Sequence, residues 1–458
     1  MATTMWIGGA PVVEHVGTIT IANTWAANDT LTVTINGKIM TLTIGTAAAT
    51  TDVATALQAA WEGTVLGAGY SVNFTGQECA EFYELISTVN GSVVTLTERA
   101  AGNASGFTEG KTFTITAGET TAGTGTATYA TTTTPTGPHH IDNNNNWSTG
   151  TAVTNNDVAI FSGDYDCKYM LDRSASITNC TLRILGSFTG QLGLPRLRSV
   201  VMPDGQTQTY EEYRDQYFKV TTGGLVAAYV GYSDGDGPTL VKIDPNTASM
   251  ALYCNKTGEP EIDSEPVVFV KNGANTSDFL VEGGSVGIGF YPDETATPAV
   301  INVSQSEDGD ESLVVIGAGV ATSGAGISVN GGTVDCRAES TDIATVRVGT
   351  GGVFTANGKS SGTIGSLKLL GGTANLNCAA TVTTTIATSG SVINLGDSLE
   401  SLVFTNFTLY AGATLLQAAM RSVTYTNGII LGAGVLPTDV TLPTQIPLLQ
   451  TSIKTTVI

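Results

Sequence analysis

Charged side chains are scarce in this sequence: they make up 13% of the 458 residues, and aromatic side chains only 7%. Threonine, serine and asparagine must therefore supply most of the polar surface, which favours β-strands and turns over helices. Basic residues are scarcer still, with 19 Lys and Arg against 40 Asp and Glu and a formal net charge of −21. Because affinity for phosphate backbones comes from clustered Lys and Arg, this composition argues against a nucleic-acid partner.

Long apolar segments are also missing. The sequence contains no uninterrupted apolar run near the length that crosses a bilayer, so we expect no membrane span. The first residues lack a basic stretch followed by an apolar segment, so we expect no secretory signal and synthesis in the cytoplasm.

Cysteine motifs are absent as well. The cysteines form no Cys-x-x-Cys pair and have no zinc-type spacing; they are Cys79, Cys167, Cys180, Cys254, Cys336 and Cys378. We expect them to be reduced and buried, with a Cys167–Cys180 bridge as the alternative. No phosphate-binding or dinucleotide fingerprint follows a strand, and no Ser or Cys near the three histidines has a nucleophile context. The sequence therefore predicts no cofactor, no metal and no catalytic triad.

What the sequence does have is a repeat. A short Gly-containing phrase returns about every twenty residues between Val/Ile/Leu/Thr runs, beginning at Gly331-Gly332, Gly351-Gly352, Gly371-Gly372, Gly390 and Gly412. Such a period is typical of a β-solenoid, in which each coil buries its apolar face by stacking on its neighbours. We expect a parallel β-helix over residues 139–436, with Trp147 closing the open end of its core.

The region 16–134 has a different pattern and predicts a small α+β domain. Alternating apolar residues flank Asn36-Gly37, which favours a hairpin with a type I′ turn. A helix is expected over Val53–Trp61, capped by Thr51-Asp52, and Asn90-Gly91 joins two further strands, Tyr83–Thr88 and Ser92–Thr97. The chain is thus expected to be mainly β, with this domain preceding the β-helix.

Two segments are candidates for partner contact. Residues 1–15 read as an N-terminal docking arm with Trp6 and Ile7 exposed, or as an arm that packs back on its own domain. An excursion at 195–220 carries the densest charge and aromatic content and either recognises a partner or covers the solenoid flank. Its candidate contact residues are Tyr210, Tyr213, Arg214 and Tyr217. Residues 437–458, which are rich in proline, are expected to form an extended C-terminal tail.

The acidic residues suggest two further hypotheses, one of catalysis and one of Ca²⁺ binding. Asp335, Arg337 and Glu339 alternate and would share one face of a strand, so they are the best catalytic guess, but a self-paired surface strand explains them as well. The acidic loops 233–237 and 306–311 could hold Ca²⁺, yet neither repeats a calcium-binding pattern, and solvated turns are the preferred interpretation.

Two passages carry a resemblance. The Asn-Asp-Thr-Leu-Thr-Val-Thr-Ile-Asn-Gly-Lys hairpin followed by the Thr-Thr-Asp-Val-Ala-Thr-Ala-Leu-Gln-Ala-Ala-Trp helix looks like a small module of structural proteins from tailed bacteriophages and prophages. Trp147, then Asn155-Asn156-Asp157-Val158-Ala159-Ile160-Phe161, then Gly-Gly-Thr-Val coils are similar to β-helical virion proteins and autotransporter passenger domains.

The resemblance implies a non-enzymatic structural protein of a phage virion, assembled in the host cytoplasm: a capsid decoration or a fibre attached through its N-terminal region. It implies other capsid or tail proteins as partners, and a homo-oligomer, with a trimer favoured. The alternatives are a receptor-binding tail spike or tail fibre, which binds or cleaves a host surface glycan, and a bacterial surface adhesin.

Overall fold

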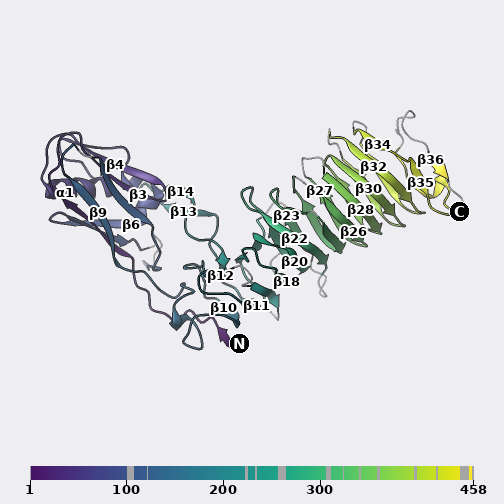
Figure 1. Cartoon of the computed structure of the whole chain (residues 1–458), viewed down its shortest axis with the longest axis horizontal. Coiled ribbons are helices and arrows are strands. Elements are labelled where there is room, and N and C mark those ends of the chain that lie inside the picture. The colour runs from purple at the N-terminus through teal and green to yellow at the C-terminus, as the bar shows by residue number, and fades with distance from the viewer. Residues whose placement is uncertain are drawn as a thin grey trace.

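The computed structural model describes residues 2–100, 108–120, 122–221, 225–232, 235–255, 265–305, 311–322, 324–339, 342–357, 362–396, 400–418, 421–443 and, for the backbone, 453–455. Within them the chain forms a small N-terminal β domain and a long parallel β-solenoid, which meet at an angle near the N-terminus (Figure 1). The solenoid has about 11 turns of roughly 22 residues each. The predicted fold class is therefore confirmed.

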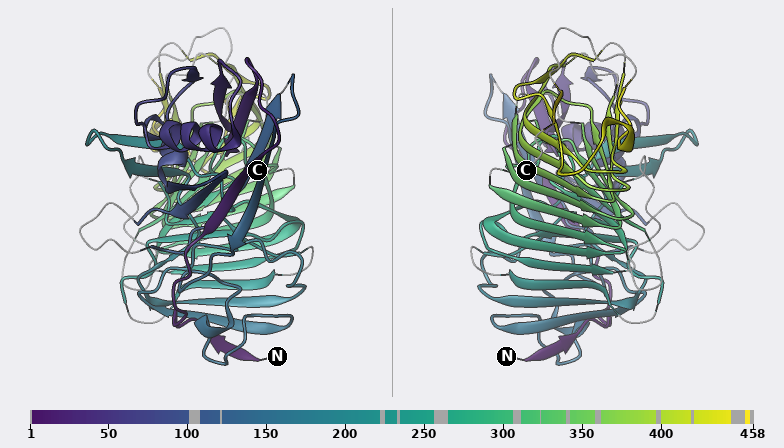
Figure 2. Two further views of the ribbon diagram at one scale, coloured as in Figure 1. Left: turned by 90° about the vertical axis from the view of Figure 1, so that its left-hand side faces the viewer. Right: turned by 90° about the vertical axis from the view of Figure 1, so that its right-hand side faces the viewer.

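Two parallel sheets form the walls of the solenoid, and their strands stack like rungs along its axis (Figure 2). Among the described residues the first sheet contains β1 (Thr3–Met5), β10 (Asp157–Gly163), β11 (Cys180–Phe188), β16 (Leu225–Tyr232), β18 (Ala251–Asn255), β20 (Asn272–Glu282), β22 (Ala296–Ser304), β24 (Ala325–Asn330), β26 (Ile343–Gly349), β28 (Gly362–Leu370), β30 (Ala380–Ala387), β32 (Leu402–Leu409), β34 (Val423–Tyr425), β35 (Ile429–Leu431) and β36 (Ile453–Thr455). The second contains β12 (Gln191–Leu192), β15 (Phe218–Lys219), β17 (Leu240–Asp244), β19 (Val268–Val270), β21 (Gly284–Ile288), β23 (Ser312–Ile316), β25 (Gly332–Cys336), β27 (Gly352–Ala356), β29 (Thr373–Leu376), β31 (Val392–Leu395) and β33 (Thr414–Gln417).

The register places equivalent residues of successive coils above one another. Phe354 of β27 lies opposite Val334 on one side and Ala374 on the other, and all three side chains point into the core. Thr355, next in β27, points outward because successive side chains of a strand alternate between its two faces. Each coil therefore covers the apolar face of the one before it, as expected of a solenoid.

Glycines of the repeated phrase occupy one corner of the coils. Their φ angles are +99° at Gly331, +75° at Gly351, +93° at Gly371, +76° at Gly390 and +79° at Gly412. Only glycine adopts this left-handed conformation without a steric penalty, so the repeat in the sequence is a repeat of backbone geometry.

The N-terminal domain contains two four-stranded antiparallel sheets and a helix. Its elements are β2 (Val16–Ala22), β3 (Thr30–Ile35), β4 (Lys38–Ile44), α1 (Thr50–Trp61), β5 (Tyr70–Val72), a 3₁₀ turn at Gly76–Glu78, α2 (Ala80–Tyr83), β6 (Leu85–Asn90), β7 (Val93–Glu98), β8 (Ile115–Thr120) and β9 (Thr126–Thr133). The helix α1 buries Val53, Leu57 and Trp61 in a core separate from that of the solenoid. The domain thus has the means to fold around its own apolar side chains.

Local predictions within this domain are mostly confirmed. Asn36 and Gly37 have φ of +50° and +70° between β3 and β4, as a type I′ turn requires. The predicted cap at Thr51-Asp52 is wrong: α1 begins at Thr50 after Ala49, and no side chain caps it. The short helix α2 also occupies the place where a strand was expected to begin at Tyr83.

The docking-arm hypothesis for residues 1–15 is wrong for its first part. Strand β1 pairs in parallel with β10, so it is the outermost strand of the solenoid sheet. Trp6 is 1% exposed and packs edge-on against Trp147, with ring centroids 5.3 Å apart. Trp147 closes the core as predicted, but it shares that role with Trp6 because an open solenoid end leaves more apolar surface than one indole covers.

Because β1 belongs to the solenoid, the N-terminal domain is an insertion between β1 and β10. The chain leaves the solenoid and returns to it side by side, with an antiparallel bridge between Val13 and Thr136.

The excursion at 195–220 is an antiparallel hairpin, β13 (Leu197–Val201) with β14 (Thr207–Glu211), followed by β15, which rejoins the solenoid. It reaches the N-terminal domain (Figure 1). In its described residues, the tail forms a 3₁₀ turn at Pro437–Asp439, Thr441 pairs with Thr414, and β36 pairs in parallel with β35.

All six cysteines are free, so the alternative Cys167–Cys180 bridge is not formed. No helix among the described residues has the length and apolar character needed to cross a membrane. Most of the two acidic loops, at 233–234 and 306–310, lies outside the described residues.

Candidate functional site

The densest group of buried charges lies where the hairpin meets the N-terminal domain. We call it the charged junction: Glu84, Lys111, Arg198, Glu212 and Arg214. Arg214 Nη2 lies 2.8 Å from Glu84 Oε2, and its Nη1 lies 2.9 Å from Glu212 Oε1. Lys111 Nζ lies 3.2 Å from Glu84 Oε1. Because Glu84 and Lys111 belong to the domain and Arg214 follows the hairpin, these pairs tie the two units together.

Burial makes this network strong. The side chains of Glu84 and Arg214 are 2% and 4% exposed. Burial alone would raise the pKa of Glu84, but the cations Arg214, Lys111 and Arg198 outweigh it and lower the pKa to about 2. The carboxylate therefore stays ionised and paired at any physiological pH.

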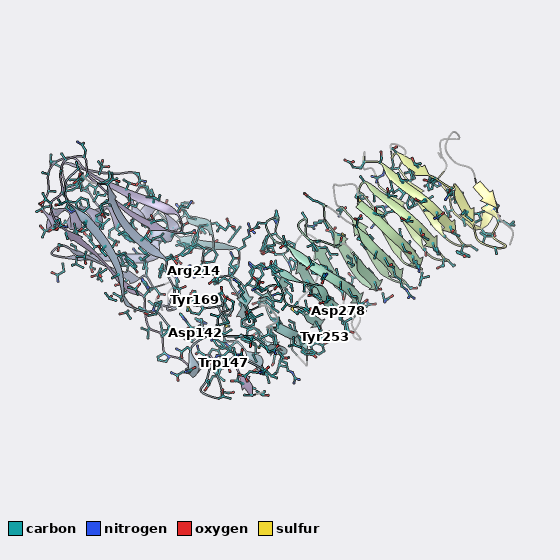
Figure 3. The ribbon with its side chains drawn as sticks, in the orientation of Figure 1. Asp142, Trp147, Tyr169, Arg214, Tyr253 and Asp278 are labelled. Atoms are coloured by element: carbon teal, nitrogen blue, oxygen red, sulfur yellow. The ribbon has the colours of Figure 1, made fainter. Side chains whose placement is uncertain are left out.

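A second set of contacts joins the domain to the first coils of the solenoid. The Tyr169 hydroxyl donates to Glu109 Oε2 at 2.7 Å, and Arg198 Nη2 lies 3.4 Å from the same oxygen. His140 Nε2 lies 2.6 Å from the carbonyl oxygen of Gly110. Arg214 and Tyr169 both lie in the bend between the two units (Figure 3). The N-terminal domain thus contacts the hairpin and the solenoid at once.

Aromatic rings enclose the junction. The Arg214 guanidinium carbon lies 4.4 Å from the ring centroid of Tyr213 and 5.0 Å from that of Phe113. Tyr210 packs with Ala80 and Met202 in a small apolar cluster between the domain and the hairpin. Rings over the guanidinium keep water from the ion pairs and add cation–π attraction.

A second cluster lies under the base of the hairpin, on the outer face of the second solenoid sheet. We call it the lysine cage: Lys242, Gln216, Tyr217, Phe269 and Tyr291. Lys242 is fully buried, and its Nζ lies 5.0 Å from the ring centroid of Tyr217 and 5.3 Å from those of Phe269 and Tyr291. The same Nζ donates to Gln216 Oε1 at 2.9 Å.

The electrostatics of the cage are unusual for a lysine. Burial lowers the pKa of Lys242 to about 8, although the carboxylates of Glu294 and Glu265 partly oppose that effect. Glu294 is itself 7% exposed and accepts hydrogen bonds from the Tyr217 hydroxyl and, at 3.3 Å, from the backbone N–H of Tyr291. A buried amine with a lowered pKa is a potential nucleophile.

Two clefts flank these clusters. One, of about 840 Å³, lies between α2 and the hairpin; its walls include Lys38, Phe74, Glu81 and Gln208. The other, of about 360 Å³, lies between the end of the hairpin and the loop that carries Asp293. Both clefts are open. The first has a mixed polar and apolar lining and the second is largely polar, and Arg196 spans the second with salt bridges to Glu211 and Asp293.

The outer face of the first sheet carries an aromatic stack that bears on the glycan hypothesis. Tyr229 and Tyr253, on neighbouring strands, stack with centroids 4.8 Å apart and an interplanar angle of 9°. The guanidinium carbon of Arg183 lies 6.0 Å from the Tyr229 centroid, and Leu280 follows Tyr253 in register. Tyr229 and Tyr253 thus cover one face of each other's rings, and this contact stabilises the stacking of the coils.

The predicted contact residues lie in different parts of the structure. Of the N-terminal pair, Trp6 is buried in the solenoid core and Ile7 is 41% exposed. The structure brings the four excursion residues together at the base of the hairpin, divided between the charged junction and the lysine cage: Tyr210, Tyr213, Arg214 and Tyr217. Their side chains contact their own chain. Tyr217 covers the solenoid flank, as the alternative interpretation expected, whereas Tyr210, Tyr213 and Arg214 lie against the N-terminal domain.

The catalytic guess at 335–339 does not have the predicted geometry. Strand β25 ends at Cys336, so Asp335, Arg337 and Glu339 do not alternate along one strand. Arg337 Nε lies 2.7 Å from Asp335 Oδ2, so these two charges pair with each other, as the alternative interpretation expected. Asn357 Nδ2 donates to Asp335 Oδ1 at 2.7 Å. Asn377 Nδ2 then donates to Asn357 Oδ1 at 3.0 Å, so Asp335 begins a polar column that links coils.

Several members of these clusters were missed in the sequence. Glu84 and Lys111 stand in ordinary strand-and-turn contexts, and Lys242 looks like a surface residue of β17. Its neighbours Val241 and Ile243 point into the core, so alternation places Lys242 outward. The only available signal was the aromatic density of the excursion that covers it.

No protein-family model, curated protein or solved structure matches this chain. Among the described residues, no three His, Cys, Asp or Glu side chains come together in a way that could hold a metal ion. The structure therefore contains two packed clusters: the charged junction, which is made of ion pairs, and the lysine cage, in which aromatic rings surround an amine.

Proposed function

We propose that this chain is a non-enzymatic structural protein of a tailed-phage particle, a capsid decoration or a fibre, in which the solenoid projects from an attached N-terminal region. The proposal takes its family from the sequence resemblance of the hairpin–helix module and the Gly-Gly-Thr-Val coils.

The observation that carries the proposal is the charged junction. A structural arm must hold its two ends at a fixed distance and angle. The solenoid core runs without interruption from Trp6 to Val440, and the ion pairs of Glu84 and Arg214 fix the N-terminal domain against its first coils. A buried salt-bridge network of this kind favours one relative orientation over others.

The acidic surface is consistent with this role. A net charge of −21 keeps a protein soluble and repels other acidic surfaces, including nucleic acid. The partners proposed are other virion proteins, reached through the part of the N-terminal domain that faces away from the hairpin. Assembly as a homotrimer remains a prediction, tested by mass measurement of the purified chain in solution.

The test is the composition of purified particles. We expect mass spectrometry of gradient-purified virions to detect the chain at a stoichiometry typical of a structural component, and cryo-EM to resolve its angled outline on the head or tail. Absence from every particle fraction would overturn the proposal.

A variant pair sharpens this test. Arg214→Met loosens the junction and is expected to lower incorporation into particles. Lys219→Met removes only the exposed pair with Asp172, whose side chains are 38% and 35% exposed, and is expected to incorporate normally. Equal incorporation of both variants would show that attachment to the particle does not depend on the charged junction.

A further inference from the structure

The lysine cage contains a reactive pair that the proposed function does not use. Lys242 Nζ lies 2.9 Å from the side-chain carbonyl oxygen of Gln216. Gln216 Nε2 donates to the carbonyl oxygen of Glu212 at 3.0 Å, which fixes the orientation of the amide. The amine and the amide carbon are thus held together by the fold rather than by chance encounter, and such positioning contributes strongly to rate.

The surroundings favour a neutral amine. Tyr217, Phe269 and Tyr291 enclose Lys242. Among the described residues Lys242 forms no salt bridge, and its burial outweighs the charges of Glu294 and Glu265. Gly193 leaves no space on its side, because a Cβ there would lie 2.8 Å from Cβ of Lys242. At a pKa of about 8, on the order of a tenth of the Lys242 side chains are uncharged at neutral pH.

We infer that Lys242 and Gln216 become joined by an intramolecular isopeptide bond. The lone pair of neutral Lys242 Nζ attacks Cδ of Gln216, and a C–N bond forms. The bond between Cδ and Nε2 of Gln216 then breaks, and the nitrogen leaves as ammonia with the proton lost by Nζ. One amine and one primary amide give one secondary amide and one ammonia, with no oxidant, reductant or added cofactor.

We assign the transfer of that proton to Glu294, whose charge acts on the Lys242 amine although the two form no salt bridge among the described residues. Of the charged neighbours of Lys242, it acts on the amine most strongly. The Tyr217 hydroxyl and the backbone N–H of Tyr291 hold its two oxygens, so the side chain has a fixed position in the cage. A carboxylate accepts and returns a proton when it is within hydrogen-bond reach, either directly or through one water.

The bond would lock the base of the hairpin to the solenoid. Strand β15 pairs with β17 through only Phe218 and Lys219, opposite Ile243 and Asp244. A covalent link next to this short ladder closes a loop between Gln216 and Lys242, and closing a loop restricts the unfolded chain as a disulfide does. The charged junction would then rest on a hairpin that cannot peel away from its coil.

The test is the mass of the full-length chain, measured after complete denaturation. We expect it to lie below the mass calculated from the sequence by one ammonia molecule. Trypsin does not cleave after an acylated lysine, so digestion should yield a branched peptide in which 215–219 is joined to 220–256, uncut at Lys242. An intact mass equal to the calculated one, with linear peptides ending at Lys242, overturns the inference.

Variants exclude other sources of the same mass loss, such as cyclisation at Asn36-Gly37. Lys242→Arg keeps a cation among the rings but cannot form the bond, and Gln216→Met keeps the shape of the side chain without the amide. Both are expected to have the calculated mass. The matched control is Lys271→Arg, since Lys271 Nζ lies 4.3 Å from the Tyr217 ring and should leave the deficit unchanged. A deficit that persists in Lys242→Arg would also overturn the inference.

Discussion

Arg214 Nη2 lies 2.8 Å from Glu84 Oε2, so a guanidinium that follows the solenoid hairpin bonds a carboxylate that stands 130 residues earlier in the chain. Glu84 belongs to the N-terminal domain, whose own core does not include either residue. The relative position of the two units therefore depends on a small number of identifiable contacts, these ion pairs and the apolar cluster of Tyr210, Ala80 and Met202.

The first prediction concerns that pair. Arg214→Met should lower the free energy of unfolding by about 3 to 5 kcal/mol, because it leaves Glu84 and Glu212 buried with fewer cations. Urea denaturation followed by tryptophan fluorescence measures the change. Lys219→Met, at the exposed pair with Asp172, is the control and should change stability by less than about 1 kcal/mol. Equal losses in the two variants would contradict the assigned importance of the junction.

The second prediction concerns acid. Burial lowers the pKa of His15 to about 4, with the nearby Arg214 cation adding to the effect. The unfolded chain takes up this proton near pH 6.5, so stability should fall as pH drops from about 6.5 to 4. The surrounding cations lower the pKa of Glu84 to about 2 in the folded chain. Below about pH 4.5 the Glu84 carboxylate therefore takes up a proton in the unfolded chain first, and stability should fall further.

The check is urea denaturation at a series of pH values. His15→Gln removes the imidazole, so the loss between pH 6.5 and 4.5 should become smaller than in the original chain, whereas the loss below pH 4.5 should remain. If the stability of the two proteins changed in parallel between pH 6.5 and 4.5, His15 would have the same pKa in the folded and unfolded chains.

The third prediction concerns the closed end of the solenoid. Trp6→Ala should destabilise the first coils by about 3 to 5 kcal/mol, because it opens a cavity beside Trp147 and Phe161. Hydrogen exchange of the β10 and β11 amides is the direct measurement and should become faster. Met5→Ala, at the neighbouring residue, which is 39% exposed, should leave that exchange nearly unchanged.

The fourth prediction separates two glycines. A Cβ on Gly372 would lie 2.3 Å from the carbonyl oxygen of Gly349, so Gly372→Ala must displace backbone and should destabilise the chain by more than about 1 kcal/mol. A Cβ on Gly326 meets nothing within 4 Å at an ordinary φ, so Gly326→Ala should be neutral or slightly stabilising. Thermal unfolding of both variants decides, and a reversed order would contradict the packing described.

Much of the fold could be predicted because its signals are local. The glycine repeat marks corners where φ must be positive, and Asn36-Gly37 fixes a hairpin through the dihedrals that these two residues accept. Trp147 is a large apolar residue next to the first solenoid strand, and it lies where a plug was expected. Each of these inferences needs only neighbouring residues.

The joint could not be predicted in the same way. The pairing of Glu84 with Arg214 depends on how two folded units meet, and neither sequence neighbourhood contains the other residue. Likewise, strand alternation places Lys242 on the outer face of its sheet, and it is buried because the excursion and the rings of Phe269 and Tyr291 cover it. The sequence pointed to the excursion residues, but as a surface for a partner. Aromatic and charged side chains are typical both of interfaces and of contacts within one chain, so their type alone could not distinguish the two.

The insertion of the N-terminal domain between β1 and β10 sets an order of events during synthesis. Residues 2–7 leave the ribosome long before their partner strand, which begins only at Asp157. At about 5 to 20 residues per second, the nascent β1 remains unpaired for on the order of 10 s. During that interval the domain can fold around its own core, and its completion brings Val13 and Thr136 together and delivers β1 to the first coil. A translational pause before Asp157 would therefore lengthen the time in which an unpaired apolar strand is open to chaperones or proteases.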